Sequence, residues 1–169
     1  MFYHLQFDLD EVVFFLKNGD YSFFDYYSDY SEKDAVVYMK GTGCLYICNV
    51  SDDVIPEETV RLAIDVLEHL DECLKQAYDT LVHWDFDHHT WDFKRKCFKE
   101  DPKEVFELDE ILFGSDGWTS CDFQKYCPDP EPQSVDDSFW IKFRCDPLEF
   151  SVQFRSRDRR LYSIQPYIL

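Results

Sequence analysis

Three histidines and two aspartates fall within the segment HWDFDHHTW, residues 83 to 91. Zinc is bound by imidazole, thiolate and carboxylate groups that converge in a tetrahedron, and histidine is also the commonest general base. If a helix continues through the segment, its polar groups point around the helix axis, whereas a loop could fold around a cation. Two hypotheses therefore stay open: a helix end with imidazoles near the negative pole of the dipole, or the centre of a metal-dependent hydrolase formed by His83, Asp85, Asp87, His88 and His89.

The tripeptide Asp87-His88-His89 is similar to the signature of the DHH phosphoesterases, in which it supplies metal ligands beside aspartates at strand ends. The resemblance covers three residues of 169, and this chain lacks the parallel α/β pattern and the glycine-rich substrate segment of that family. We attribute the match to chance. The chain also has no G-x-S-x-G, P-loop or G-x-G-x-x-G motif. These patterns favour a non-enzymatic protein without a cofactor.

Seven cysteines are present, with no CxxC pair. Cys44, Cys73 and Cys145 each lie among apolar neighbours, which is typical of buried thiols in a reducing compartment. The first residues lack a basic leader region, and no apolar run approaches the roughly 20 residues that span a bilayer. We therefore expect a cytoplasmic protein that does not enter membranes.

The net charge is −18 and is distributed unevenly. Residues 1 to 90 carry 19 acidic and 5 basic residues, whereas residues 91 to 169 carry 16 and 12. Phosphate groups would be repelled by such a chain, so direct nucleic-acid binding is not expected. The charge favours a basic protein partner, and leaves the oligomeric state undetermined.

The segment GDYSFFDYYSDYSEKD, residues 19 to 34, interleaves aromatic and acidic residues. Aromatic side chains anchor protein interfaces, and neighbouring acids attract a basic partner. The alternative interpretation is that the aromatic residues are core and the acids a solvated face. A second acidic candidate is the proline-rich loop at 128 to 137. The residues predicted to bind are Tyr21, Phe24, Asp25, Tyr26, Tyr27, Asp29 and Tyr30.

Hydrophobic periodicity predicts the elements. Residues 35 to 50 are typical of a hairpin around Gly41-Thr42-Gly43, while strand and helix cannot be separated for VVFFL at 12 to 16. Pro56 and the acids after it predict a helix start, and a helix from about 56 to 83 follows. Its apolar stripe comprises Val60, Ala63, Leu67, Leu70, Leu74, Ala77 and Leu81.

Period-two patterns from about 105 to 167 predict an antiparallel meander. The strands are expected at 105–113, 118–126, 138–145, 148–155 and 161–167. No βαβ alternation is evident. We therefore predict an α+β protein over residues 1–169 as a single domain, with N-terminal strands within 1–50. In it, one long amphipathic helix packs against a mainly antiparallel β-sheet.

The leading functional hypothesis is a non-enzymatic acidic domain that binds a basic protein. In general character it resembles the immunity proteins that neutralise bacterial toxins, many of which are basic nucleases. The alternatives are the metal-dependent hydrolase centred on residues 83–89, a nucleic-acid mimic whose helix acids imitate phosphates, and a structural or interaction protein of another kind.

Overall fold

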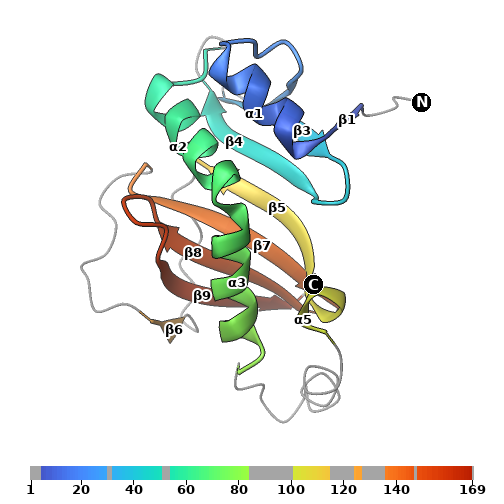
Figure 1. Ribbon diagram of the computed structural model, residues 1–169, viewed down its shortest axis with the longest axis vertical. Helices are drawn as coiled ribbons and strands as arrows, with labels where there is room; N and C mark the ends of the chain where they lie inside the picture. Colours follow the sequence, from blue (N-terminus) through green and yellow to red (C-terminus); the bar gives the residue numbers. More distant parts are fainter. Residues whose placement is uncertain are drawn as a thin grey trace.

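The computed structural model describes residues 5–29, 32–50, 54–83, 101–114, 124–126, 136–146 and 148–168. Figure 1 shows a twisted sheet with helices crossing one side of it. The helices are α1 (Leu9–Lys17), α2 (Glu57–Glu68), α3 (Leu70–Leu81) and the short α5 (Pro102–Val105). The strands are β1 (Gln6–Phe7), β2 (Asp25–Asp29), β3 (Glu32–Met39), β4 (Cys44–Val50), β5 (Glu107–Phe113), β6 (Gln124–Lys125), β7 (Ser138–Cys145), β8 (Leu148–Arg155) and β9 (Leu161–Ile168).

The described strands form one sheet in the order β1-β3-β4-β5-β7-β8-β9-β6, and β2 pairs with β3 beside β1. Most pairings are antiparallel, including the β3–β4 hairpin and the β7–β8–β9 meander. The predicted α+β class with a mainly antiparallel sheet is therefore confirmed. The predicted strand at 118–126 is described only as Gln124–Lys125. The predicted meander order is wrong at this strand, because β6 pairs with β9 at the sheet edge while β5 pairs directly with β7.

Two parallel pairings were missed by the sequence prediction. Strands β1 and β3 pair in parallel, with helix α1 and strand β2 between them in the sequence. Strands β4 and β5 pair in parallel, with Leu45 opposite Ile111, and helices α2 and α3 lie between them in the sequence. Parallel neighbours need a long connection of this kind, because a tight turn can join only antiparallel strands. The N-terminal strands and the C-terminal meander therefore join through β4–β5 into one sheet.

The hydrophobic core lies between the helices and one face of the sheet. Alternate strand residues such as Ala35, Leu45, Ile111 and Val152 are fully or almost fully buried on this face. The rings of Phe139 and Phe154 stack there with centroids 5.1 Å apart. Helices α2 and α3 cross the sheet diagonally in Figure 1 and cover this face with their apolar stripes. Among the described residues, no helix is long and apolar enough to cross a membrane.

The undecided segment at 12–16 is helical. Helix α1 begins after Asp8, whose backbone N–H donates to Glu11 Oε2 at 2.9 Å, half of a capping box. Val12 and Leu16 enter the core, and Phe14 points away from it with 63% of its surface exposed. The spacing of buried positions is thus helical rather than alternating.

The expected single helix from 56 to 83 is wrong, because the structure divides it at His69. His69 has φ −118° and ψ 23°, outside the helical range, and separates α2 from α3. Its ring Nδ1 donates to the Asp65 carbonyl oxygen at 2.7 Å, which is the acceptor of its own backbone N–H. A side chain that competes for this carbonyl distorts the helical hydrogen-bond ladder.

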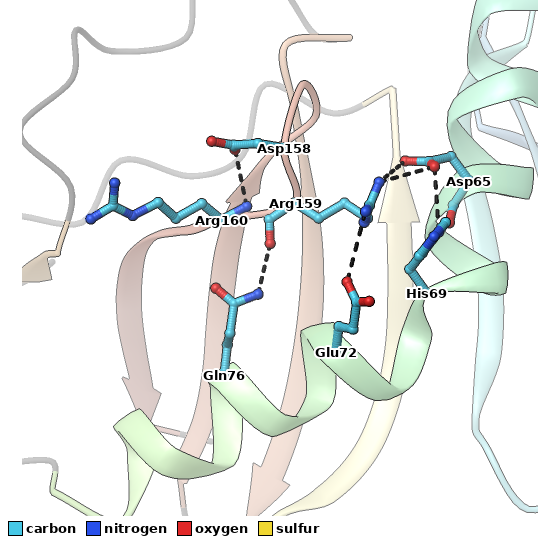
Figure 2. A network of polar contacts seen from close by, with 7 residues as sticks. All are labelled: Asp65, His69, Glu72, Gln76, Asp158, Arg159 and Arg160. Atoms are coloured by element: carbon cyan, nitrogen blue, oxygen red, sulfur yellow. Dashed lines mark hydrogen bonds and ion pairs between the residues drawn. The ribbon is translucent and has the colours of Figure 1, made fainter.

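A polar network connects the helix break to the turn between β8 and β9 (Figure 2). Arg159 Nη1 donates to both carboxylate oxygens of Asp65, at 3.0 and 2.8 Å, and Arg159 Nη2 lies 3.7 Å from Glu72 Oε2. Gln76 Nε2 donates to the Arg159 carbonyl at 2.8 Å, and Gln76 Oε1 accepts from the Leu161 N–H. The network holds Arg159 in a left-handed conformation, with φ 56°. These contacts connect helices α2 and α3 to the turn between β8 and β9 and to the start of β9.

Candidate functional site

The structure separates the predicted binding residues into core and surface. Phe24 is 4% exposed and belongs to the core, and Tyr21 is half-buried against it. Asp25, Tyr26 and Tyr27 are exposed on strand β2. The side chain of Asp29 and the whole of Tyr30 lie outside the described residues. Each interpretation of the segment therefore applies to part of it. Phe24 is a core residue, whereas residues 25–27 are exposed at the surface.

Most of the exposed large apolar side chains come from the start of the chain. The large hydrophobic residues most exposed in the described part of the chain are Leu5, Phe14, Tyr26, Tyr27, Val54 and Tyr126. Four of these six belong to the first 27 residues, before and within β2. Together with Asp25, we name Leu5, Phe14, Tyr26 and Tyr27 the N-terminal edge. Exposed aromatic side chains are typical of interaction surfaces.

Ring contacts connect the helix and the strand of the N-terminal edge. The ring of Phe14 is 5.9 Å from that of Phe15, which lies 5.1 Å from Phe23. Phe23 stacks on buried Phe24 at 4.5 Å, and Phe24 lies 6.4 Å from Tyr26. The exposed rings at both ends therefore rest on a packed aromatic base, which limits the conformational freedom that binding would remove.

Tyr26 and Tyr27 point to opposite faces of the sheet, as successive strand residues must. Tyr26 lies opposite buried Ala35, on the helix side. Tyr27 lies opposite Asp34 and is hydrogen-bonded to Tyr38. A partner that contacts both rings must therefore reach around strand β2.

Carboxylates surround the tyrosines on the face that the helices leave uncovered. Tyr46 donates from its hydroxyl to Asp34 Oδ2 at 2.9 Å. The hydrogen bond with Tyr27, burial and the charge of Asp25 together raise the pKa of Tyr38 to about 12. Burial, and then the Asp34 hydrogen bond, raise the pKa of Tyr46 as well. These phenols are neutral hydrogen-bonding groups at physiological pH in a negative local field.

Two of the described thiols, those of Cys44 and Cys73, are not activated nucleophiles. Burial, with the nearby charges of Glu110 and Asp109, raises the pKa of Cys44 to about 12. Burial raises the pKa of Cys73 to about 12. Both are free thiols. Because the thiolate is the reactive form, these two cysteines are poor nucleophiles at neutral pH.

Most of the predicted metal-binding segment lies outside the described residues. His83 is exposed in the turn after α3, and its backbone N–H donates to the Thr80 carbonyl at 3.1 Å. Asp85, Asp87, His88 and His89 are not described. In the described part of the chain, no group of three His, Cys, Asp or Glu residues is placed to hold a metal ion. The metal hypothesis for residues 83–89 therefore stays a prediction.

The second acidic candidate, residues 128–137, is described only at its end. Asp136 Oδ1 accepts a hydrogen bond from Thr59 Oγ1 at 3.3 Å, and the Asp137 carbonyl accepts from the Ser156 N–H. The carboxylate of Asp136 is thus engaged with helix α2. Asp129 and Glu131 lie outside the described residues.

Sequence reasoning missed Phe14 and Leu5 as surface residues. The signal for Phe14 was the helical spacing of Leu9, Val12, Val13 and Leu16, which leaves position 14 on the opposite side. That signal was unreadable while residues 12–16 were undecided between helix and strand. For Leu5, which precedes the two-residue strand β1, the sequence holds no comparable signal.

Comparison with known proteins adds no relative: no family model matches the chain, and neither a curated protein nor a solved structure is significantly similar to it.

Proposed function

We propose that this chain is a non-enzymatic acidic domain that binds a basic protein through its N-terminal edge, as an immunity-like inhibitor binds a basic toxin or nuclease. The observation that carries the proposal is the concentration of exposed apolar side chains at Leu5, Phe14, Tyr26 and Tyr27. They lie in the half of the chain that also holds most of the negative charge.

Charge and aromatic contacts have separate roles in this mechanism. A net charge of −18 attracts a basic protein over a Debye length and raises the association rate. Phe14, Tyr26 and Tyr27 then lose water against the partner and slow its release. Asp25, exposed on the same face of β2 as Tyr27, is placed to pair with lysine or arginine at the contact.

The proposed compartment is the cytoplasm. Cys44 and Cys73 are free thiols, and Cys73 is buried. Such thiols persist where the surroundings are reducing. The inhibitor would then protect the cell from within.

A peptide-display selection with the intact protein as bait tests the proposed function. From a random 16-residue library we expect peptides that combine several Lys or Arg residues with apolar ones. The double variant Phe14→Ser/Tyr26→Ser should weaken the selected peptides about tenfold or more, which corresponds to about 1.4 kcal/mol of lost contact. Tyr27→Ser, tested alone, reports on the opposite face of the strand.

Val54→Ser is the matched control, because Val54 is 65% exposed and lies outside the N-terminal edge. It should leave the affinity unchanged. Selected peptides without net positive charge, or affinities that the edge variants do not alter, would overturn the proposal.

A further inference from the structure

A groove separates helix α1 from the break between α2 and α3. Its cavity has a volume of about 310 Å³ and is lined by Leu9, Asp10, Val13, Leu67, Glu68, Leu70 and Asp71. All of these belong to described helices, so the groove is built on regular structure. Its volume lies at the small end of ligand sites, which suits one long side chain rather than a large molecule.

The lining divides into an apolar floor and an acidic rim. Leu67 and Leu70 are at most 4% exposed, and Leu9 and Val13 are half-buried. Asp10, Glu68 and Asp71 are exposed around them. Lysine and arginine place an aliphatic stem on apolar surface and keep the charged head in water. The groove is therefore complementary to both halves of such a side chain.

The chain itself supplies a precedent at the rim. The ammonium group of Lys17, in the last turn of α1, forms an ion pair with Glu68. The side chain of Lys17 remains 52% exposed, and Lys17 is not among the residues that line the cavity. Glu68 can thus hold an ammonium group, and the exposed carboxylates of Asp10 and Asp71 are accessible to a second cation.

The groove is adjacent to the N-terminal edge. Asp10 and Phe14 are four residues apart on α1 and so lie on the same side of that helix. A basic segment that reaches the groove can therefore also contact the exposed ring of Phe14. The break at His69 contributes as well, because it places Leu70 and Asp71 at the start of a new helix.

We infer that this groove is the pocket for a lysine or arginine side chain of the basic protein partner. The inference rests on the proposed function, and it specifies which side chain of the partner is buried at the contact. The stem of the side chain packs on the half-buried Leu9 and Val13, in the cavity that Leu67 and Leu70 also line, and its cationic head pairs with Asp71 and Asp10. Glu68 then forms an ion pair with the incoming cation, either in place of its ion pair with Lys17 or in addition to it.

Nuclear magnetic resonance with two small probes tests the pocket without the partner. N-acetyl-lysine amide carries the stem and the charge, and N-acetyl-norleucine amide carries a stem of the same length without the charge. We expect saturable shifts of the Leu9, Val13, Leu67 and Leu70 methyl groups with the lysine probe. The dissociation constant should be on the order of millimolar, as for other fragments. The norleucine probe should bind at least about threefold more weakly.

Three variants identify the site. Asp71→Asn should weaken the lysine probe about threefold, and Lys17→Met should strengthen it about threefold, because the internal competitor for Glu68 is removed. Glu58→Gln is the control. It removes an exposed carboxylate from the start of helix α2, which also carries Glu68, and should have no effect on binding of the lysine probe. A gain of binding in Lys17→Met cannot result from misfolding.

The outcomes separate the inference from the proposed function. Equal binding of both probes, unsaturable shifts scattered over many carboxylates, or no response to Lys17→Met would overturn the pocket. If the pocket binds the lysine probe but the edge variants leave selected peptides unaffected, the proposed function fails while the pocket stands. If the selected peptides depend on Phe14 and Tyr26 but the lysine probe does not bind the groove, the proposed function stands while the pocket fails.

Discussion

Gly43 lies where the β3–β4 turn meets the start of strand β5. A Cβ atom at this position would lie 2.3 Å from the Asp109 carbonyl oxygen, far inside contact distance. Its φ of +71° is also in the left-handed region that favours glycine. Gly41, in the same turn, has φ +70°, but a Cβ atom added there would meet no atom within 4 Å. The two glycines share a backbone requirement, but only Gly43 is closely approached by the backbone of β5, at Leu108 and Asp109.

Substituting each glycine by alanine should therefore separate backbone strain from close approach. Gly41→Ala is expected to lower the free energy of unfolding by about 1 kcal/mol, the cost of a left-handed alanine. Gly43→Ala adds a clash with the backbone of β5 and should cost about 3 kcal/mol or more. Urea denaturation of both variants measures the difference. Equal losses would mean that β5 yields to the added methyl group without cost.

At the scale of elements, the connection between Arg159 and Asp65 determines how the helices rest on the sheet. Arg159 is 22% exposed and Asp65 is 39% exposed, so the pair is partly screened by water. Arg159 Nη1 donates to both oxygens of the Asp65 carboxylate, and the hydrogen bond from Gln76 to the Arg159 backbone adds a second attachment. We expect a double-mutant cycle of Asp65→Asn and Arg159→Met to give a coupling energy of about 1 kcal/mol in urea denaturation.

The exposed pair Lys75–Asp79 on α3 is the control for that cycle. Its side chains are 77% and 66% exposed, so its coupling should stay within a few tenths of a kcal/mol. The left-handed φ of Arg159 gives a second readout. Arg159→Gly should be less destabilising than Arg159→Ala by about 1 kcal/mol, because only glycine relieves the backbone strain. Equal coupling energies for Asp65–Arg159 and Lys75–Asp79 would show that the network does not stabilise the packing of the helices on the sheet.

The same elements show what the sequence could predict. The apolar stripe from Val60 to Leu81 was correct, because the buried positions continue across His69. Periodicity records which side of a helix is buried and not whether the backbone is continuous. The break depends on the His69 ring bond to Asp65 and on Arg159, which is 94 residues from Asp65 in the sequence. No local pattern could reveal that partner.

The site was predictable to a similar extent. The mixture of tyrosine and aspartate in residues 25–27 indicated a surface, and those residues are exposed. The burial of Phe24 depends on its packing with Phe23 and the core. The parallel β4–β5 pairing was missed because period-two patterns identify strands but do not reveal their order in a sheet. The groove beside α1 likewise needs that helix brought against the consecutive helices α2 and α3, about 50 residues further along the chain.

At the scale of the whole molecule, the charge opposes compaction. The chain has 35 acidic and 17 basic residues, so even complete pairing would leave 18 carboxylates without a cationic partner. Their mutual repulsion destabilises the folded state, and salt screens it within a Debye length of about 10 Å at 0.1 M. Salt also weakens exposed ion pairs such as Arg61–Glu57. These two effects have opposite signs, and exposed pairs contribute little each.

We therefore expect the repulsion to dominate and salt to stabilise the protein. The urea midpoint at pH 7 should rise when sodium chloride is increased from 0.02 to 0.3 M, and urea is suitable because it adds no ions of its own. Sucrose at the same osmolality is the control, since it is excluded from the protein surface without screening charge, and sodium chloride should raise the midpoint more than sucrose does. A midpoint that falls with salt would show that ion pairs outweigh the repulsion. The charge would then contribute less to attracting a basic partner than the proposed mechanism requires.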